Sequence, residues 1–405
     1  MIQGFVHALR IQSKIIFIVV RNLKGLTQVV VTAENKEFEK AKNLTLESVV
    51  RCIGEMKEAP QAPGGSEMHP DKIIILSQAD PELPIPVVLK GSEETEAPIR
   101  FDYRWIDLRK PEKVKIFKAW TEFEKGWRKY WSDNGFIQLY PPALMSTPSE
   151  SGAEVFEVKY FDRKAYLAQS PQFYKQMAMA AGFEKVFMTS PVFRAEESFT
   201  TRHMTEFTGW DFEISYIDSH HDVMDAEEGM IVEGFKALGL DAPARPFPRI
   251  TMVEAKKILS ERDIPSAEEH DVSPEEERAL YEYVKEKYNH EFVFLTDYHK
   301  SKSAFYHMRL ENDPDRSRRA DLLYRGLEVT TLAQREHRPE ILEKQALEKG
   351  MNLEPLKDYL SFFRWGCPPH GGAGIGPGRF IMKILDLPNV REATFLPRDV
   401  KRLNP

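Results

Sequence analysis

Alternating hydrophobic positions in the first eighty residues predict a small β structure. Strand-like runs occupy residues 2–9, 14–20, 27–32, 48–56 and 72–77. A charged stretch with helical spacing lies between the third and fourth runs, at residues 37–44. Five strands with a helix after the third is the order of an OB-fold, a β-barrel that often binds oligonucleotides. Other small barrels share this order, so the pattern alone leaves the choice open.

Proline and glycine mark the segments around these strands. Residues 58–70 are predicted to form a loop before the last run. From about residue 79 to residue 111 the chain is rich in proline and charge and has no clear period, which favours a hinge. We therefore predict a barrel over residues 1–88, a hinge over 89–112 and a second domain over 113–405.

The hydrophobic period becomes helical in the second domain. Apolar residues from Ile116 to Trp131 recur every three or four positions, which predicts a long amphipathic helix ending near Gly135. Strand-like and helical runs then alternate up to the C-terminus. This is the pattern of an α+β domain.

Composition narrows the class of protein. The 405 residues are 42% hydrophobic, and no stretch of about 20 uncharged apolar residues could span a membrane. Cys52 and Cys367 lie far apart, which excludes a disulfide framework and a cysteine zinc site and suits the cytoplasm. The net charge of −7 means that any RNA partner must bind local basic patches.

Residues 193–213 form the first candidate site. The two ends of this segment read as strands and the polar middle as a loop that contains Glu196, Arg202 and His203. Arg194 and Phe207 could meet over one ligand, a guanidinium for a phosphate and an aromatic face for a base. The alternative is a charged hairpin on the surface.

Residues 319–337 form the second candidate site. A hairpin turning at Tyr324-Arg325 would place Asp321 directly opposite Glu328. Facing carboxylates destabilise a hairpin unless a cation lies between them, and oxygen ligands of this kind suit Mg²⁺ bound to ATP phosphates. In a different register the two carboxylates would not meet.

Two further segments offer anion-binding groups. Residues 371–387 predict a glycine-rich turn followed by Arg379 and by an apolar helix that begins at Phe380, a common arrangement for phosphates. Residues 166–183 predict a strand, a Ser-Pro break and a helix whose first turns carry Gln172 and Lys175. Taken singly, a glycine-rich turn and a lone lysine are often without function.

Taken together and in order, these segments resemble the class II aminoacyl-tRNA synthetases, and most closely the aspartyl-tRNA synthetase family. The resemblance extends from GFVHALR to the closing FLPRDVKRLNP and includes AQSPQFYKQ, RHMTEFTGWD, AQREH and GCPPHGGAGIG. It implies an N-terminal OB-fold that binds the anticodon. It also implies a class II catalytic domain on a six- to seven-stranded antiparallel sheet flanked by helices.

The resemblance assigns ATP-binding roles. Arg194 would hold the α-phosphate and the aspartate carboxylate, Glu196 the adenine amino group, and Phe207 would stack on adenine. Arg379 would cover adenine and grip the γ-phosphate. The remaining assignments are Arg202 and His203 in the loop that reaches the phosphates and the tRNA acceptor end, and Asp321, Glu328 and Thr331 at the Mg²⁺ positions.

It also implies an aspartate pocket and an anticodon site. Lys175 and Arg335 would bind the aspartate side chain, and Gln172 and Asp211 the α-amino group. Ser149, Glu150 and Gly152 would belong to a mobile loop over the pocket, and Arg10, Phe17, Gln28 and Glu67 to the surface that reads the anticodon. The expected partners are L-aspartate, tRNA-Asp and a second copy of the chain, with no DNA.

Three features depart from the family. Pro377-Gly378 stands where Glu usually precedes the arginine, Leu332 replaces a glycine, and a lead-in to the first barrel strand is missing. The length matches the shorter archaeal and eukaryotic type. An asparaginyl-tRNA synthetase and a non-catalytic paralogue are the alternatives; Lys175 and TGWD count against the first, and the retained charged residues against the second. Whether tRNA-Asn is also a substrate stays open.

Overall fold

The computed structural model describes residues 1–89, 91, 93–148, 154–266 and 268–405. The chain divides into two compact units, Met1–Lys115 with Pro405, and Ile116–Asn404. Within the described ranges, no helix combines the length and apolarity that crossing a membrane requires.

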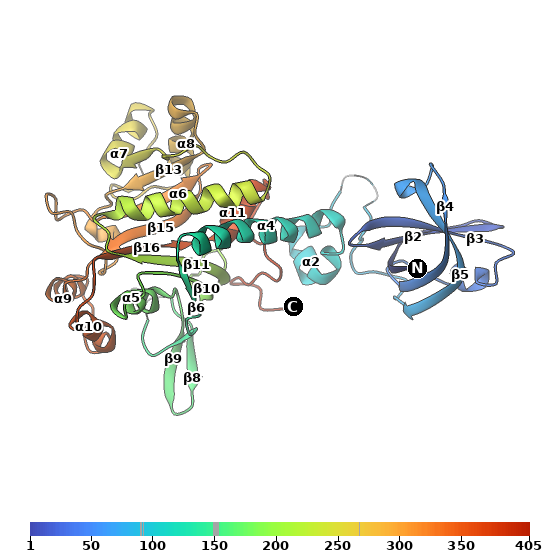
Figure 1. The fold of residues 1–405 in the computed structure, drawn as a ribbon, viewed down its shortest axis with the longest axis horizontal. Coiled ribbons are helices and arrows are strands. Elements are labelled where there is room, and N and C mark those ends of the chain that lie inside the picture. The colour runs from blue at the N-terminus through green and yellow to red at the C-terminus, as the bar shows by residue number, and fades with distance from the viewer. Residues whose placement is uncertain (90, 92, 149–153, 267) are drawn as a thin grey trace. The chain divides into compact units, whose positions relative to one another are not determined.

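The first unit contains a closed five-stranded barrel (Figure 1). The strands are β1 Ile2–Ile11, β2 Ile15–Asn22, β3 Gly25–Thr32, β4 Val49–Glu58 and β5 Ser66–Ser77, with helix α1 Phe38–Lys42 after β3. They pair in the order β1-β2-β3-β5-β4. Alternate residues such as Ile16, Ile18 and Val20 point into the core, as the period-two pattern predicts. The predicted OB-fold is confirmed.

The predicted loop at residues 58–70 is shorter than expected. Strand β5 begins at Ser66 and pairs with β4 across a bulge at Ile53-Gly54, opposite Pro70. A Cβ atom on Gly54 would lie 2.0 Å from the His69 carbonyl oxygen, so only glycine allows this approach. In the predicted hinge the chain forms two short helices, α2 Ala97–Asp102 and α3 Arg104–Asp107.

The second unit is built on an eight-stranded sheet of order β12-β13-β14-β15-β16-β11-β10-β6. Its strands are β6 Ile137–Leu139, β10 Lys185–Phe193, β11 Glu206–Ser215, β12 Arg249–Thr251, β13 Phe292–Thr296, β14 Arg319–Tyr324, β15 Glu328–Arg335 and β16 His370–Ile375. The six central strands are antiparallel, as expected. The outermost strands β12 and β6 pair in parallel with their neighbours.

Helices cover both faces of this sheet (Figure 1). Those that pack on one face are α4 Pro111–Asp133, α6 His220–Ala237 and α11 Pro377–Ile384. Trp127 of α4 lies 4.6 Å from Trp210 of β11 and 5.4 Å from Phe380 of α11, measured between ring centroids. The aromatic stripe predicted from spacing therefore anchors α4 in the main core. The helix ends before Gly135, whose φ of 76° favours glycine.

The opposite face carries α5 Gln172–Ala180, α7 Met252–Glu261 and α8 Pro274–Tyr288. Helix α8 begins at a capping box, in which Ser273 and Glu276 each accept a hydrogen bond from the other's backbone N–H. The remaining elements are β7 Leu144–Met145, β8 Glu157–Tyr160 and β9 Arg163–Leu167 in a small sheet, and helices α9 Pro339–Glu348 and α10 Lys357–Phe363.

Candidate active site

Strand register brings four of the predicted catalytic-domain residues to one face of the large sheet: Asp211, Asp321, Thr331 and Arg335. Asp211 and Glu213 of β11 pair with Gly374 and Gly372 of β16, and those glycines pair with Thr331 and Ala333 of β15. Because paired residues in adjacent strands point to the same face, this row is shared by three strands. The row continues to Arg335, which pairs with His370, and to Asp321, which pairs with Thr331.

The glycine run does not form the predicted turn. Residues 371–374 lie inside strand β16, and the chain turns only at Gly376 before α11 begins at Pro377. The glycines leave space on the site face. A Cβ atom at Gly372 would lie 2.2 Å from Oε2 of Glu213, so any larger residue would collide with this carboxylate.

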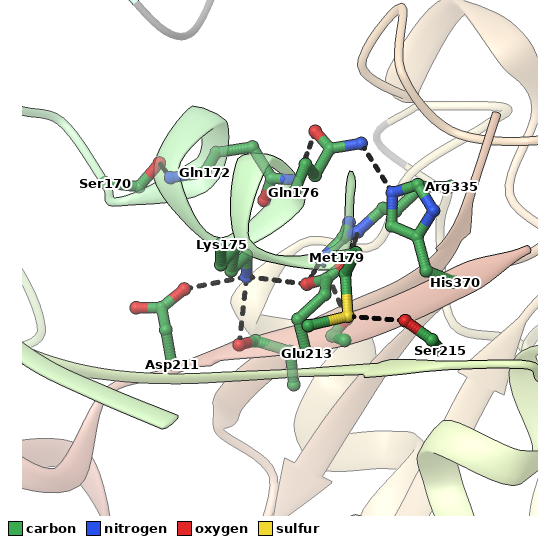
Figure 2. Close-up of polar contacts among 12 residues, drawn as sticks. Ser170, Gln172, Lys175, Gln176, Met179, Asp211, Glu213, Ser215, Arg335 and His370 are labelled. Carbon is green, nitrogen blue, oxygen red and sulfur yellow. Dashed lines mark hydrogen bonds and ion pairs between the residues drawn. The ribbon is translucent and has the colours of Figure 1, made fainter. Parts of the chain in front are cut away.

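Lys175 is buried between helix α5 and strand β11 (Figure 2). Its Nζ donates to Oδ2 of Asp211 at 2.8 Å and to the Ala373 carbonyl at 3.1 Å, and lies 3.5 Å from Oε2 of Glu213. With 1% of the residue exposed, this lysine is not an ordinary solvated one. Lys175 on α5 therefore places a cation beside the carboxylates of Asp211 and Glu213.

Arg335 approaches the same carboxylate from β15 (Figure 2). Its Nε donates to Oε1 of Glu213 at 3.0 Å, and its Nη2 donates to Oε2 at 3.4 Å and to the Gly372 carbonyl at 2.8 Å. Burial by itself would raise the pKa of Glu213, but Arg335 and Lys175 outweigh it and hold the pKa below its ordinary value.

Glu213 is the residue that sequence reasoning missed. It lies two positions after Asp211 in a strand, so both side chains point to the same face. Between them Phe212 points into the core. The pocket thus contains two cations and two carboxylates, and its charges balance before any ligand binds.

Among the other predicted pocket residues, Gln172 lies in the described part of the chain, whereas the three loop residues do not. Gln172 occupies the first turn of α5, is buried, and donates from Nε2 to Oε1 of Gln176 at 2.9 Å. The predictions for Ser149, Glu150 and Gly152 lie outside the described residues.

The β10–β11 connection carries the predicted nucleotide-binding groups. Residues 194–205 join the two strands, as expected. The guanidinium carbon of Arg194 lies 5.6 Å from the ring centroid of Phe207, and Arg194 Nη1 lies 3.7 Å from Oε1 of Glu196. The Arg194 side chain is 45% exposed. The predicted meeting of Arg194 and Phe207 thus occurs, on a surface open to a ligand.

Two further loop residues have partners of their own. Arg202 donates from Nη1 to Oε2 of Glu277 on α8 at 2.6 Å. Burial raises the pKa of Glu277 to about 7, with Arg202 opposing the shift. Nδ1 of His203 lies 3.0 Å from Oγ of Ser198. Partial burial and the nearby Arg379 lower the pKa of His203.

The predicted register of the β14–β15 hairpin is wrong. The chain turns at Arg325-Gly326, with φ values of 47° and 69°, and a bulge shifts the strands once more. Asp321 therefore lies opposite Thr331, whereas Glu328 lies opposite Leu323. The two carboxylates are near enough to interact, but they are not a directly facing pair.

Each carboxylate has a cationic partner. Arg319 holds Asp321 through two hydrogen bonds of 2.7 and 3.2 Å. Arg379 lies 3.5 Å from Oε2 of Glu328 and donates to the Glu328 carbonyl at 2.8 Å. Burial, and secondarily Glu328, raise the pKa of Asp321, against Arg319. Arg379, at the start of α11, thus lies beside Glu328 of β15.

The predicted anticodon residues share the outer surface of the barrel. Arg10 pairs with Phe17 across β1 and β2, and its guanidinium carbon lies 4.8 Å from the ring centroid. Gln28 pairs with Glu67 across β3 and β5, and its Nε2 donates to Oε2 of Glu67 at 3.0 Å. His69 contacts the other Glu67 oxygen at 3.0 Å. The spacing chosen from sequence thus gives an aromatic ring and polar groups on adjoining strands.

Comparison with known families gives two matches. Residues 96–400 match the family described as tRNA synthetases class II (D, K and N), and residues 1–76 match the OB-fold nucleic acid binding domain. Among curated relatives, the aspartate–tRNA(Asp/Asn) ligase of Aeropyrum pernix is 40% identical over 99% of this chain and 94% of its own length. The aspartate–tRNA(Asp) ligase of Thermococcus kodakarensis is 38% identical over 100% and 95%.

Solved structures with the same fold include both amino-acid specificities. Asparaginyl-tRNA synthetase from Pyrococcus horikoshii, complexed with asparaginyl-adenylate, has a TM-score of 0.90 at 32% identity and covers 100% of this chain and 95% of its own. Aspartyl-tRNA synthetase from Entamoeba histolytica has a TM-score of 0.88 at 31% identity, with coverages of 100% and 89%. Backbone similarity therefore does not separate aspartate from asparagine.

Proposed function

Because the chain belongs to the class II tRNA synthetases of the D, K and N group, we propose that it activates L-aspartate with ATP and transfers it to tRNA-Asp. Relatives at 38–40% identity over the whole chain carry aspartate–tRNA ligase names. Since asparaginyl-tRNA synthetases share the backbone, the amino-acid pocket must decide between the two substrates.

The arrangement of Lys175 between Asp211 and Glu213 carries the proposal. Aspartate brings an α-ammonium and a side-chain carboxylate, so it can exchange partners with the Lys175–Asp211 ion pair. The ammonium takes Asp211, and the side-chain carboxylate takes Lys175 and Arg335. Every charge inside the pocket then keeps a counter-charge, as a buried site requires.

Asparagine would break this balance. Its ammonium would still pair with Asp211. Its neutral amide, however, could not supply the negative charge that the aspartate side chain brings to Lys175. One buried positive charge would be left in excess, and a buried charge without its partner costs more than a neutral group does. Shape cannot separate the two amino acids, so we assign the selection to charge.

The nucleotide side would supply positioning and charge neutralisation. Phe207 would stack on adenine, with Glu196 at its amino group, while Arg194 and Arg379 bind the phosphates. The aspartate α-carboxylate attacks the α-phosphate in line and pyrophosphate leaves. The terminal ribose hydroxyl of tRNA then displaces AMP from the aspartyl-adenylate. No covalent bond to the protein is needed, because catalysis comes from orientation and electrostatics.

The oxygen groups of the β14–β15 hairpin fit Mg²⁺ in their chemistry. Asp321, Glu328 and Thr331 supply the hard oxygen donors that this ion prefers, and the two carboxylates interact unfavourably in its absence. Mg²⁺ would neutralise the charge on ATP phosphates. Glu328 and Thr331 would reach it most simply, since Arg319 holds Asp321 through two hydrogen bonds whereas Arg379 lies 3.5 Å from the Glu328 carboxylate.

The barrel would read the anticodon through Phe17 and its neighbours. Stacking of a base on an aromatic ring is worth roughly 1–3 kcal/mol, so Phe17→Ala should weaken tRNA charging by about one to two orders of magnitude. Aspartate activation without tRNA should be unchanged, and it serves as the control. An equal loss in both reactions would make Phe17 a structural residue instead.

We extend the proposal to a homodimer built on α4 and the edge strand β6, because the helix that ends near Gly135 and the strand that leads to Pro142 resemble the segment that forms the dimer interface in the family. Sedimentation equilibrium would give twice the chain mass of 46.8 kDa if this is correct. A monomer at working concentration would contradict it.

The proposed function is tested by ATP–pyrophosphate exchange with aspartate, asparagine and lysine in turn. We expect exchange with aspartate alone. Separate transcripts of tRNA-Asp and tRNA-Asn would then show whether charging extends to tRNA-Asn. Exchange with asparagine at the rate seen with aspartate would replace the proposal with an asparaginyl-tRNA synthetase.

A further inference from the structure

A second polar cluster lies behind the amino-acid pocket, between α5, α10 and β16. It consists of Gln172, Gln176, Tyr359 and His370, all of them buried. Nε2 of Gln172 and the hydroxyl of Tyr359 both donate to Oε1 of Gln176 at 2.9 Å. Nε2 of Gln176 lies 3.0 Å from Nε2 of His370 (Figure 2).

The backbone fixes the direction of these hydrogen bonds. Nδ1 of His370 lies 2.8 Å from the carbonyl oxygen of Pro368, which can only accept, so Nδ1 carries a hydrogen. In a neutral imidazole Nε2 must then be an acceptor. Gln176 therefore turns its amide nitrogen to His370 and its oxygen to Gln172.

The surroundings of His370 keep the ring neutral. Burial lowers its pKa to about 4; Glu213 and the Pro368 carbonyl oppose this shift, and Arg335 and His337 add to it. The ring also stacks on Phe363 of α10, with centroids 6.2 Å apart. At neutral pH the hydrogen-bond direction is therefore constant.

We propose that His370 is a positioning residue which, through Gln176, turns the amide of Gln172 so that its oxygen is left for the α-ammonium of the substrate. Nε2 of Gln172 donates to Gln176, and this fixes the orientation of the Gln172 amide. Its Oε1 is then the atom that can accept a hydrogen bond from the substrate. The reversed amide would present N–H groups to a cation. The inference rests on the proposed function, since it assigns Gln172 to the amino group.

The direction of the chain can be observed without any activity. Neutron diffraction from perdeuterated wild-type crystals at neutral pH should show deuterium on Nδ1 of His370 and none on Nε2. It should also show both deuterons of Gln176 on the atom nearest His370. Deuterium on Nε2 of His370 would overturn the proposal, whether or not the protein activates aspartate.

A pair of substitutions at Gln176 tests the consequence for binding. Gln176→Met keeps the volume but removes the acceptor for Gln172, so KM for aspartate should rise about tenfold while kcat and KM for ATP change little. Gln176→Glu keeps an acceptor oxygen towards Gln172 and can share a proton with His370. It should restore KM to within about threefold of wild type.

The matched control is Ser215→Ala, which removes a nearby hydroxyl that bonds the sulfur of Met179 on the same helix. It should leave KM for aspartate unchanged. If Gln176 served packing alone, Met would be tolerated better than a buried Glu. A smaller effect of Gln176→Met than of Gln176→Glu would therefore contradict the proposal.

Discussion

The two halves of the candidate active site are built differently. In the amino-acid pocket, Lys175, Arg335 and Glu213 are at most 2% exposed, and they bind one another. On the nucleotide side, Arg194 is 45% exposed and has one carboxylate partner at 3.7 Å. The pocket is buried and electrically balanced, whereas Arg194 on the nucleotide side is exposed and loosely paired.

This difference suits the amino-acid pocket to selecting the substrate and the nucleotide side to catalysis. A closed, balanced pocket discriminates by charge, because a ligand that upsets the balance leaves a buried group unpaired. An open group with few partners costs little in stability when removed, but it is available to a large anionic substrate. We therefore expect substitutions in the pocket to affect folding and activity together, and substitution of the exposed Arg194 to affect activity alone.

The largest effect should follow Arg335→Leu. This change removes the two-point partner of Glu213, and breaking such a buried pair costs about 3–5 kcal/mol of unfolding free energy. Aspartate activation should fall by about three orders of magnitude or more. Arg335→Lys should rescue little, because a lysine is a point charge that cannot reproduce the planar fork.

The double variant Arg335→Leu/Glu213→Gln separates the two effects. It removes the carboxylate that Arg335→Leu leaves with only Lys175 as a partner, so chemical denaturation should show most of the stability restored. ATP–pyrophosphate exchange should stay low. Recovery of both quantities together would mean that Arg335 has no direct role in activation.

Arg194→Ala should have the next largest effect on activity. Loss of one group that stabilises charge in a transition state typically costs 10²–10³ in rate, and we expect about that loss in exchange. The unfolding free energy should change by less than about 0.5 kcal/mol, because the side chain lies at the surface. Arg338→Ala is the matched control, since Arg338 is 49% exposed and also bonds one carboxylate; its activity should be near that of wild type.

Glu277 offers a smaller, pH-dependent test of the nucleotide side. Burial raises its pKa from 4.5 to about 7, so its neutral form stabilises the fold at low pH. That contribution is complete below pH 4.5 and is lost as the pH rises through 7, which amounts to about 3 kcal/mol. The Glu277→Gln variant should not show this loss of stability as the pH rises, because glutamine does not ionise. Parallel stability profiles of the two proteins between pH 5 and 8 would refute this assignment.

Local periodicity and turn chemistry predicted the fold well. The alternation in β1–β5 predicted a small five-stranded β structure, which the family resemblance specified as an OB-fold, and the apolar spacing of α4 predicted the helix and its end at Gly135. The antiparallel centre of the large sheet followed from the family resemblance. The short helices α2 and α3 were not predicted, because their segment has no clear period.

The candidate site was predicted only in part, because the sequence of one strand does not show which distant segment pairs with it. Lys175 and Arg335 were expected to converge on a ligand, but Glu213 already joins them, and only its place two residues after Asp211 hinted at this. The register of Asp321 failed because the turn is at Arg325-Gly326 and a bulge follows it. His370 was not expected to matter, since its partners lie on other elements.

The central claim is that charge in the closed pocket selects aspartate, and the most direct test compares kcat/KM for aspartate and asparagine in ATP–pyrophosphate exchange. We predict that the wild type prefers aspartate by at least about a hundredfold, and that Lys175→Met lowers this preference by about tenfold or more. Lys175→Met keeps the length of the side chain but removes the charge. Equal use of both amino acids by the wild type, or an unchanged preference in a folded Lys175→Met variant, would contradict the account.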